Sequence, residues 1–232
     1  MAKRAVADSK DDEVDDLPLV ESIYQAILER IVSGRLQDGA IVSELALSHD
    51  LGVSRTPVHD AVRQLVKDSL VVWERGRRPR VARFTSDDIY QIFEMRKYLE
   101  GPAAELAAGR MDRRHLTPLR NGIDALQTSR NDSTWTERWA EFDDQFHSVI
   151  AEASGNRRLA ADINRYRLLH KVFNRMATDP DGLQSAMREH LGILEALENH
   201  DGKLARERMI AHISVWQDYF VQKLQRSSEK GR

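Results

Sequence analysis

The feature that most constrains the fold is a tight turn between a short helical segment and a second, amphipathic one. Gly52 marks the turn, and Ser54 or Thr56 can cap the helix that follows. Pro57 falls in the first turn of that helix, where no intrahelical N–H bond is lost. Apolar residues then recur at helical spacing and predict a buried stripe made of Val58, Ala61, Val62, Leu65 and Val66.

A different, polar face of this helix carries side chains that suit a nucleic acid. Arg55, His59 and Arg63 recur every four residues, and Thr56 lies beside them. Arginine can donate two hydrogen bonds to guanine, while threonine and histidine can reach a base or a phosphate. Residues 54–83 contain eight basic and three acidic side chains, although the net charge of the chain is −2. This local excess is typical of a surface that contacts a phosphate backbone.

Helical segments precede the turn, and a small hairpin follows the third helix. Apolar spacings of three and four from Val20 to Ile31 predict a first helix, and Ser43 caps a short second one. Two extended pieces, Leu70–Trp73 and Arg80–Arg83, flank a basic turn. This order is typical of a winged helix-turn-helix, which we expect over residues 18–84. The expected DNA-binding residues are Arg55, Thr56, His59, Arg63, Arg77 and Arg78.

The rest of the chain predicts helices without strands. Apolar periodicity and turn signals indicate helices at about 86–110, 113–129, 134–153, 157–178, 183–199 and 203–226. Six helices of this length form a bundle. The expected fold class is therefore mainly α: an N-terminal winged helix-turn-helix with a small β-hairpin wing, and a C-terminal antiparallel α-helical bundle over residues 85–228.

Composition excludes several protein classes. No apolar run reaches the roughly 20 residues that cross a bilayer, and no signal-peptide stretch opens the chain. The chain has no cysteine, which excludes disulfides and thiolate zinc sites and is typical of a cytoplasmic protein. Residues 1–17 are polar and acidic without periodicity, so we expect a disordered tail there.

Three histidines and one aspartate form a candidate metal site in the second half. Asp143 and His147 are four residues apart on one helical face, whereas His190 and His212 lie on two later helices. Apolar neighbours at helical spacing point all three imidazoles into the core, where an unpaired imidazole is costly. Separate, satisfied core histidines are the alternative, and spacing alone does not decide. The ligand set suits a divalent metal, with zinc the default and nickel or manganese also fitting.

Both halves of the chain resemble one family of transcriptional regulators. The GVSRTPV stretch from Gly52 to Val58 resembles the GntR family, and the resemblance extends from about Ile23 to Arg83. Residues 86–226 resemble the FCD effector domain of the FadR-like subfamily, in its VanR-like six-helix type. The resemblance implies a homodimer on double-stranded operator DNA, controlled by a small effector.

The resemblance also implies roles for particular residues. In the FCD domain the metal ligands occupy the positions of Asp143, His147, His190 and His212, and all four are present here. Arg96 corresponds to an arginine that faces the cavity and would clamp a carboxylic-acid effector; a pair with Glu100, four residues on, is the alternative. The remaining histidines do not match, and we expect surface roles for them: His49, His115, His170 and His200.

Two positions depart from the family pattern. Family members often carry DNA-contacting arginines where this chain has Leu45 and His59. The DNA-contacting roles that the resemblance implies therefore apply to Arg55 and Thr56. His59 is a weaker substitute for the family's arginine, and Leu45 cannot take over the role of the arginine that it replaces. The operator sequence is expected to differ accordingly.

Three functions remain open from the sequence. The first is a ligand-controlled transcription factor, expected to be a repressor and not an enzyme. The second is a metal-dependent hydrolase or lyase, since such a ligand set can activate water. Against it, no general base is identifiable beside the ligands, and the N-terminal half would have no role. The third is a constitutive DNA binder that contains a structural metal.

Overall fold

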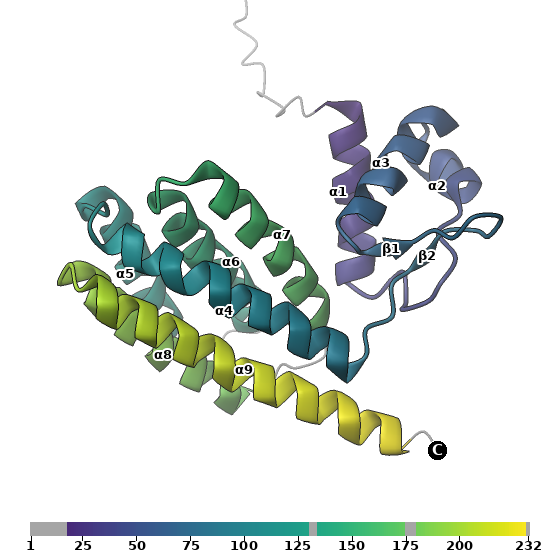
Figure 1. The fold of residues 1–232 in the computed structure, drawn as a ribbon. Helices are drawn as coiled ribbons and strands as arrows, with labels where there is room; N and C mark the ends of the chain where they lie inside the picture. Colours follow the sequence, from purple (N-terminus) through teal and green to yellow (C-terminus); the bar gives the residue numbers. More distant parts are fainter. Residues whose placement is uncertain (1–17, 130–133, 175–179, 231–232) are drawn as a thin grey trace, which may run out of the picture.

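A computed structural model describes residues 18–129, 134–174 and 180–230, so the predicted tail at 1–17 lies outside the described residues. The described residues form nine helices and two short strands (Figure 1). In chain order these are α1 (Leu19–Val32), α2 (Glu44–Leu51), α3 (Arg55–Lys67), β1 (Val71–Val72), β2 (Arg80–Val81), α4 (Ser86–Ala108), α5 (Arg113–Thr128), α6 (Trp135–Ala153), α7 (Arg157–Asn174), α8 (Pro180–Glu198) and α9 (Gly202–Lys230). The mainly α fold class is confirmed.

The first three helices pack around a shared apolar core. Ser43 caps α2 by accepting a hydrogen bond from the Ala46 amide, and Gly52 ends that helix in a left-handed conformation with φ of 67°. Ser54 is the N-cap residue of α3, although its side chain makes no capping hydrogen bond. The predicted stripe of α3 is buried except for Val66, which is half-buried. The polar face of α3 is therefore exposed to solvent.

The hairpin is shorter than expected and has one additional partner. β1 and β2 pair antiparallel with Val71 opposite Val81, so each strand has two residues where the sequence indicated four. Ile41, in the segment before α2, forms a single bridge to Arg80. One bridge is too short to leave an alternating sequence pattern, which is why the sequence did not reveal it.

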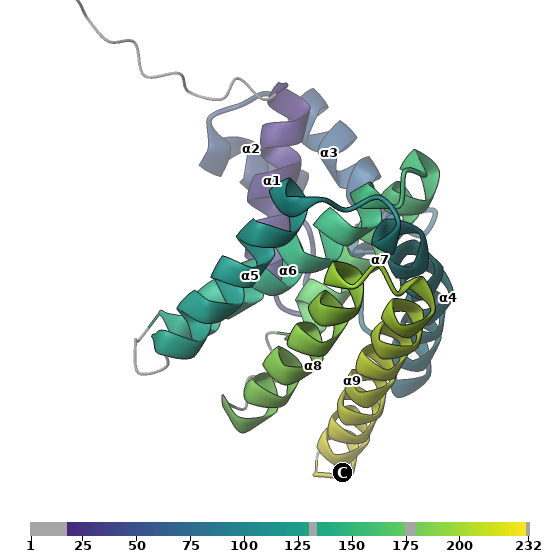
Figure 2. The same ribbon diagram turned by 90° about the vertical axis from the view of Figure 1, so that its left-hand side faces the viewer.

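Helices α4 to α9 form the predicted bundle (Figure 2). A capping box between Thr85 and Asp88 fixes the start of α4. α4 and α9 run side by side, so closely that a Cβ added to Gly101 would lie only 2.7 Å from Ile210 Cγ1. α8 begins at Pro180, three residues earlier than expected, since proline is tolerated in a first turn.

The bundle contacts the N-terminal helices through α7. The Arg165 guanidinium donates to the Lys67 carbonyl at the end of α3, and its Nε lies 3.8 Å from Asp68 Oδ1. The Tyr24 hydroxyl of α1 donates to Asp68 Oδ2 at 2.8 Å. α1 and α7 therefore both contact Asp68, the residue that caps the C-terminal end of α3.

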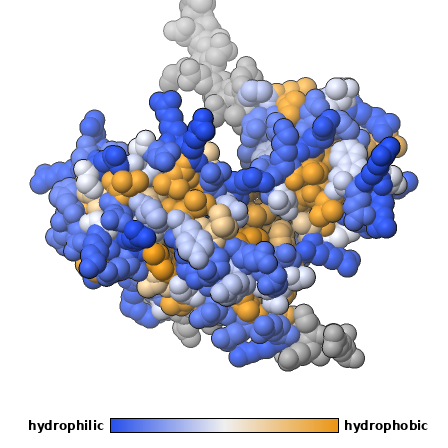
Figure 3. All heavy atoms as spheres, viewed as in Figure 1, coloured by the Kyte–Doolittle hydropathy of each residue, from blue (hydrophilic) through white to orange (hydrophobic). Residues whose placement is uncertain are grey.

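Hydrophilic side chains cover most of the face drawn in Figure 3, with apolar ones in small groups among them. No helix in the described ranges combines the length and apolar character needed to cross a membrane.

Candidate metal centre and DNA-binding face

The residues predicted to contact DNA lie on α3 and on the hairpin turn. Arg55, Thr56 and Arg63 are exposed on α3. Arg77 and Arg78 are exposed between β1 and β2. The packing of the apolar stripe therefore leaves these donors accessible to a partner.

His59 is held by two neighbours that the sequence did not reveal. Its Nδ1 lies 3.0 Å from Glu44 Oε1 at the start of α2, and its ring meets Trp73 edge-on at 5.2 Å between centroids. A groove of about 500 Å³ between α3 and the hairpin includes His59 and Arg63 in its wall. Leu45, beside Glu44, leaves 65% of its surface exposed. Neither partner is close to His59 in the sequence, so only the tertiary fold could show them.

The structure brings the four candidate metal ligands together. Asp143 and His147 come from α6, His190 from α8 and His212 from α9, and one ligand atom of each lies within 4.8 Å of the others. All four are buried. His147 Nε2 lies 3.2 Å from His190 Nε2, which in turn lies 3.4 Å from Asp143 Oδ1. The four potential ligands therefore converge on one point in the bundle core.

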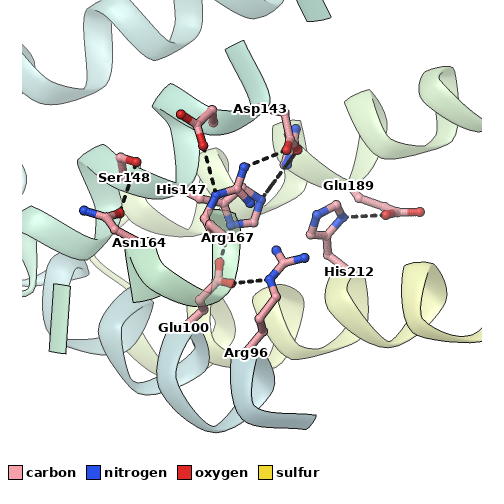
Figure 4. Close-up of polar contacts among 11 residues, drawn as sticks. Arg96, Glu100, Asp143, His147, Ser148, Asn164, Arg167, Glu189 and His212 are labelled. Atoms are coloured by element: carbon pink, nitrogen blue, oxygen red, sulfur yellow. Dashed lines mark hydrogen bonds and ion pairs between the residues drawn. The ribbon is translucent and has the colours of Figure 1, made fainter. Parts of the chain in front are cut away.

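Two glutamates orient the imidazoles of this set. Glu100 Oε2 accepts a hydrogen bond from His147 Nδ1, and Glu189 Oε2 accepts one from His212 Nδ1 at 2.7 Å. Figure 4 shows Glu100 between Arg96 and His147, with Glu189 beside His212. A carboxylate that accepts a hydrogen bond from Nδ1 keeps the imidazole proton on that nitrogen. The lone pair is then on Nε2, as is typical of metal-bound histidine.

The Nε2 atoms of this set fit a cation. With Nδ1 of His147 protonated, its Nε2 lone pair faces His190 Nε2 at 3.2 Å. In the tautomer of His190 that leaves Nε2 unprotonated, the two lone pairs would repel each other, whereas a cation between them would be bound by both. The carboxylate of Asp143 adds a negative charge at the same point. The donor set is therefore one that a divalent transition metal prefers.

Two buried arginines balance the carboxylates. Arg96 Nε donates to Glu100 Oε1 at 2.7 Å, which is the pair that the sequence offered as the alternative for Arg96. Its guanidinium nevertheless points toward the middle of the group (Figure 4). Arg167 of α7 donates to Asp143 Oδ2 at 2.7 Å. The sequence did not identify Arg167, because it stands in a segment rich in arginine and gives no pattern of its own.

Burial and these charges set the protonation states. Burial alone would raise the pKa of Asp143, but the Arg167 guanidinium, with the imidazoles of His147 and His190, holds it well below its usual value. Burial lowers the pKa of His147 well below its usual value, and Arg167 adds to the shift. Burial, followed by the proximity of His212, also lowers the pKa of His190. Asp143 is therefore an ionised carboxylate, and His147 and His190 are neutral imidazoles, the forms that bind metal.

His170 corrects one expectation from the sequence. We expected a surface role, but its side chain is buried and lies edge-on between Phe93 and Phe220. Together with Arg96 and Asp143 it lines a cavity of about 10 Å³ beside the ligands. That volume holds about one water molecule.

The glutamates also bear on the enzyme alternative. Glu100 and Glu189 do lie beside the ligands, where the sequence identified no candidate base. Each is committed to the Nδ1 atom of a ligand histidine. They therefore orient imidazoles and do not face the shared point where a water could be activated.

Comparison with known proteins identifies both halves of the chain. The profile for "Bacterial regulatory proteins, gntR family" matches residues 19–81, and that for the FCD domain matches residues 91–215. The chain is 27% identical over 198 residues to the "Probable D-xylose utilization operon transcriptional repressor" of Paenarthrobacter nicotinovorans, covering 85% of this chain and 87% of that protein. It is 26% identical over 223 residues to the "HTH-type transcriptional regulator LutR" of Bacillus subtilis, covering 84% of this chain and 100% of that protein.

A solved structure shows the same fold. "E. coli McbR/YncC" superposes with a TM-score of 0.77 at 20% sequence identity, covering 89% of this chain and 99% of that one. By their names, the D-xylose operon repressor and LutR are transcriptional regulators and not enzymes.

Proposed function

The chain belongs to the GntR family of bacterial transcriptional regulators and carries an FCD domain, and from this premise we propose that it is a repressor whose DNA binding is controlled by a small organic acid bound at a metal site. The observation that carries the proposal is the convergence of Asp143, His147, His190 and His212 in the core of the bundle.

We assign DNA binding to residues 18–84 and effector sensing to residues 85–228. Exposed Arg55, Thr56 and Arg63 on α3 would enter the major groove, assisted by His59, which Glu44 holds in place. The exposed turn arginines Arg77 and Arg78 would contact the backbone or the minor groove. Such a protein acts where the chromosome is, so we propose a cytoplasmic location.

We propose a homodimer on a pseudo-palindromic operator, because two copies would present two α3 helices to successive half-sites. An exposed apolar stripe on α4 supports this assembly. Met95, Tyr98 and Leu106 lie at helical spacing and expose 37%, 68% and 43% of their surfaces. Isolated exposed apolar residues are common, but a row along one helix favours a protein contact.

The proposed metal ligands are Asp143, His147, His190 and His212, with zinc expected from its abundance. When bound, the ion would supply a Lewis-acidic centre to which a carboxylate can bind. Glu100 and Glu189 would hold two imidazoles in the ligating tautomer. Arg167 would hold Asp143 through the oxygen that does not face the histidines.

The charges of the site favour a monoanionic effector. Arg96 and Arg167 offset two of the three carboxylates Glu100, Asp143 and Glu189, which leaves one negative charge. A divalent cation would turn this into one excess positive charge in a buried region. Because uncompensated buried charge is costly, an effector with one carboxylate would complete the site, with Arg96 as its second contact.

Elemental analysis of protein purified without a histidine tag or chelator tests the metal site. We expect near-stoichiometric metal in the wild type and its loss in His147→Ala and His190→Ala. His170→Phe is the matched control, because this histidine is buried beside the set without belonging to it. If the wild type contained no metal even after reloading, the metal site would be refuted and these histidines would be ordinary core residues.

A second candidate, a constitutive DNA binder with a structural metal, predicts the same metal content. The two functions separate on DNA. Operator sites would be selected from random sequence with the full-length protein, and small monocarboxylic acids would then be screened for release. Release by an acid, lost in Arg96→Gln with metal retained, supports sensing. Binding that no acid alters supports the structural metal.

A further inference from the structure

A second and much larger cavity adjoins the proposed metal site and shares Trp139, Asp143 and His170 with the small cavity beside the ligands. It has a volume of about 550 Å³ and opens between α6, α7 and the end of α1. The cavity beside the metal ligands measures only about 10 Å³. Small-molecule sites have volumes of roughly 300–1,000 Å³ and occur preferentially where domains meet. By size and position, the larger cavity is suited to an organic ligand.

The walls of this cavity come from both halves of the chain. Val32 contributes from the last turn of α1, Trp139 and Ala140 from α6, and Lys171 from α7. The indole of Trp139 is stacked at 5.3 Å on His190, so its position is fixed from the core side. Val32 can line the cavity only while α1 lies against the bundle. A ligand with an apolar body would contact both halves at once.

The charges in the walls select the charge of that ligand. The cations are compensated: Lys171 Nζ lies 2.8 Å from Asp144 Oδ2, and Arg167 donates to Asp143 at 2.7 Å. Glu137 and Glu141 are exposed one turn apart on α6 and line the same cavity. Among the described residues, neither of them has an ion-pair partner. Two uncompensated carboxylates beside an apolar wall favour a positively charged group over a negative one.

We propose that this cavity binds an organic cation with an apolar body. The apolar body would pack on Val32, Trp139 and Ala140, while the cationic group would lie near Glu137 and Glu141. This site takes the opposite charge from the effector proposed for the metal site and adjoins that site at Asp143. Its ligand would stabilise the arrangement in which α1 lies against α7, so a cation and an acid could act on one regulator through adjoining sites.

The test compares three probes with the same phenylbutyl body by titration calorimetry on the full-length protein. These are (4-phenylbutyl)trimethylammonium, its neutral isostere with carbon in place of nitrogen, and 5-phenylvalerate. We expect the cation to bind about tenfold more tightly than the neutral isostere, because each exposed charge pair contributes a factor of roughly 1.5–5. The carboxylate should bind most weakly at this site. Metal-loaded and chelator-treated protein should both prefer the cation over the isostere, because Glu137 and Glu141 line the cavity and are not among the proposed metal ligands.

Variants locate the binding. Glu137→Gln combined with Glu141→Gln should abolish most of the preference for the cation, while Glu152→Gln, exposed farther along α6, should leave it unchanged. Ala140→Trp should fill the cavity and lower the affinity for the cation at least tenfold. Ala140 is exposed, so the larger side chain is compatible with folding. Equal affinity for cation and isostere would overturn the proposal. So would unchanged binding in Ala140→Trp, or no binding of the cation at millimolar concentration.

Discussion

Replacing Glu100 by glutamine would separate the role of its charge from the role of its shape. In the wild type, Glu100 accepts hydrogen bonds from His147 Nδ1 and from Arg96 Nε. Glutamine has the same size, but it is neutral and its amide can present an N–H to Nδ1. The imidazole would then no longer be held with its lone pair on Nε2. We therefore expect Glu100→Gln to weaken metal binding although Glu100 is not itself a ligand.

Two effects of different size follow from the geometry. Loss of a carboxylate behind a ligand histidine typically lowers metal affinity 10–100-fold, or about 1.4–2.7 kcal/mol. Separately, Arg96 is only 2% exposed and would lose its ionised partner. Breaking a buried pair from one side costs about 3–5 kcal/mol of folding stability. The metal-free variant should thus be markedly less stable than the metal-free wild type.

A competition titration of zinc against a chromophoric chelator measures the affinity, at a temperature where circular dichroism shows the variant folded. Glu105→Gln is the matched control, since Glu105 also lies on α4 but pairs with Arg206 at the surface. Glu189→Gln should have a smaller effect, because 22% of the Glu189 side chain is exposed and water can replace its contact. Wild-type affinity in folded Glu100→Gln would refute the role in orienting His147 and leave Glu100 as the partner of Arg96 alone.

Three further predictions concern the bundle and its contact with α3. Gly101→Ala should lower the melting temperature, because a methyl group has no space there and overpacking costs about 1–3 kcal/mol. Gly109→Ala is the control, since a methyl group at Gly109 would enter open space and should leave the melting temperature unchanged. Equal melting temperatures of the two variants would contradict the close packing of α4 and α9. Burial, aided by Arg96, lowers the pKa of His170 in the folded state. Unfolding therefore lets this imidazole take up a proton once the pH falls below about 6.5, the pKa of histidine in the unfolded chain, and folding stability decreases as the pH falls further. His170→Phe should flatten that loss by up to about 1.4 kcal/mol per pH unit in denaturant titrations, and an unchanged slope would argue against a neutral buried imidazole. Arg165→Ala should speed amide exchange at the end of α3 without changing metal content, and unaltered exchange would show that this contact does not hold the helix end.

The sequence predicted the elements well because their signals are local. The buried stripe of α3, the cap at Ser43 and the turn at Gly52 depend on a few neighbouring residues, and each appears as expected, except that Val66 of the stripe is half-buried. Helix ends were less accurate, since frayed turns and a helix-opening proline leave no sharp boundary in the sequence. The bridge from Ile41 depends on a pairing partner far along the chain and therefore had no signal.

For the candidate site, the sequence indicated the ligand set but not its surroundings. Asp143 and His147 share a helical face, which is a local property, and the family resemblance placed the other two. The partners are set by helix packing: Glu189 precedes His190 in the chain, yet it contacts His212 on α9. Arg167 and the buried position of His170 likewise follow from how α7 is rotated against the bundle. No spacing rule within one helix gives that rotation.

The contacts of α7 have a mechanical consequence. Arg165 holds the end of α3, and Arg167, two residues later and on another face of the same helix, holds Asp143. A helix is stiff over two residues, so the backbone positions of the two arginines move together. Any displacement of the Asp143 carboxylate that draws Arg167 with it would turn or slide α7 and shift Arg165 at the end of α3. The path from the bundle core to the DNA-binding helix would then be one rigid segment less than a full turn long, with no flexible linker in between.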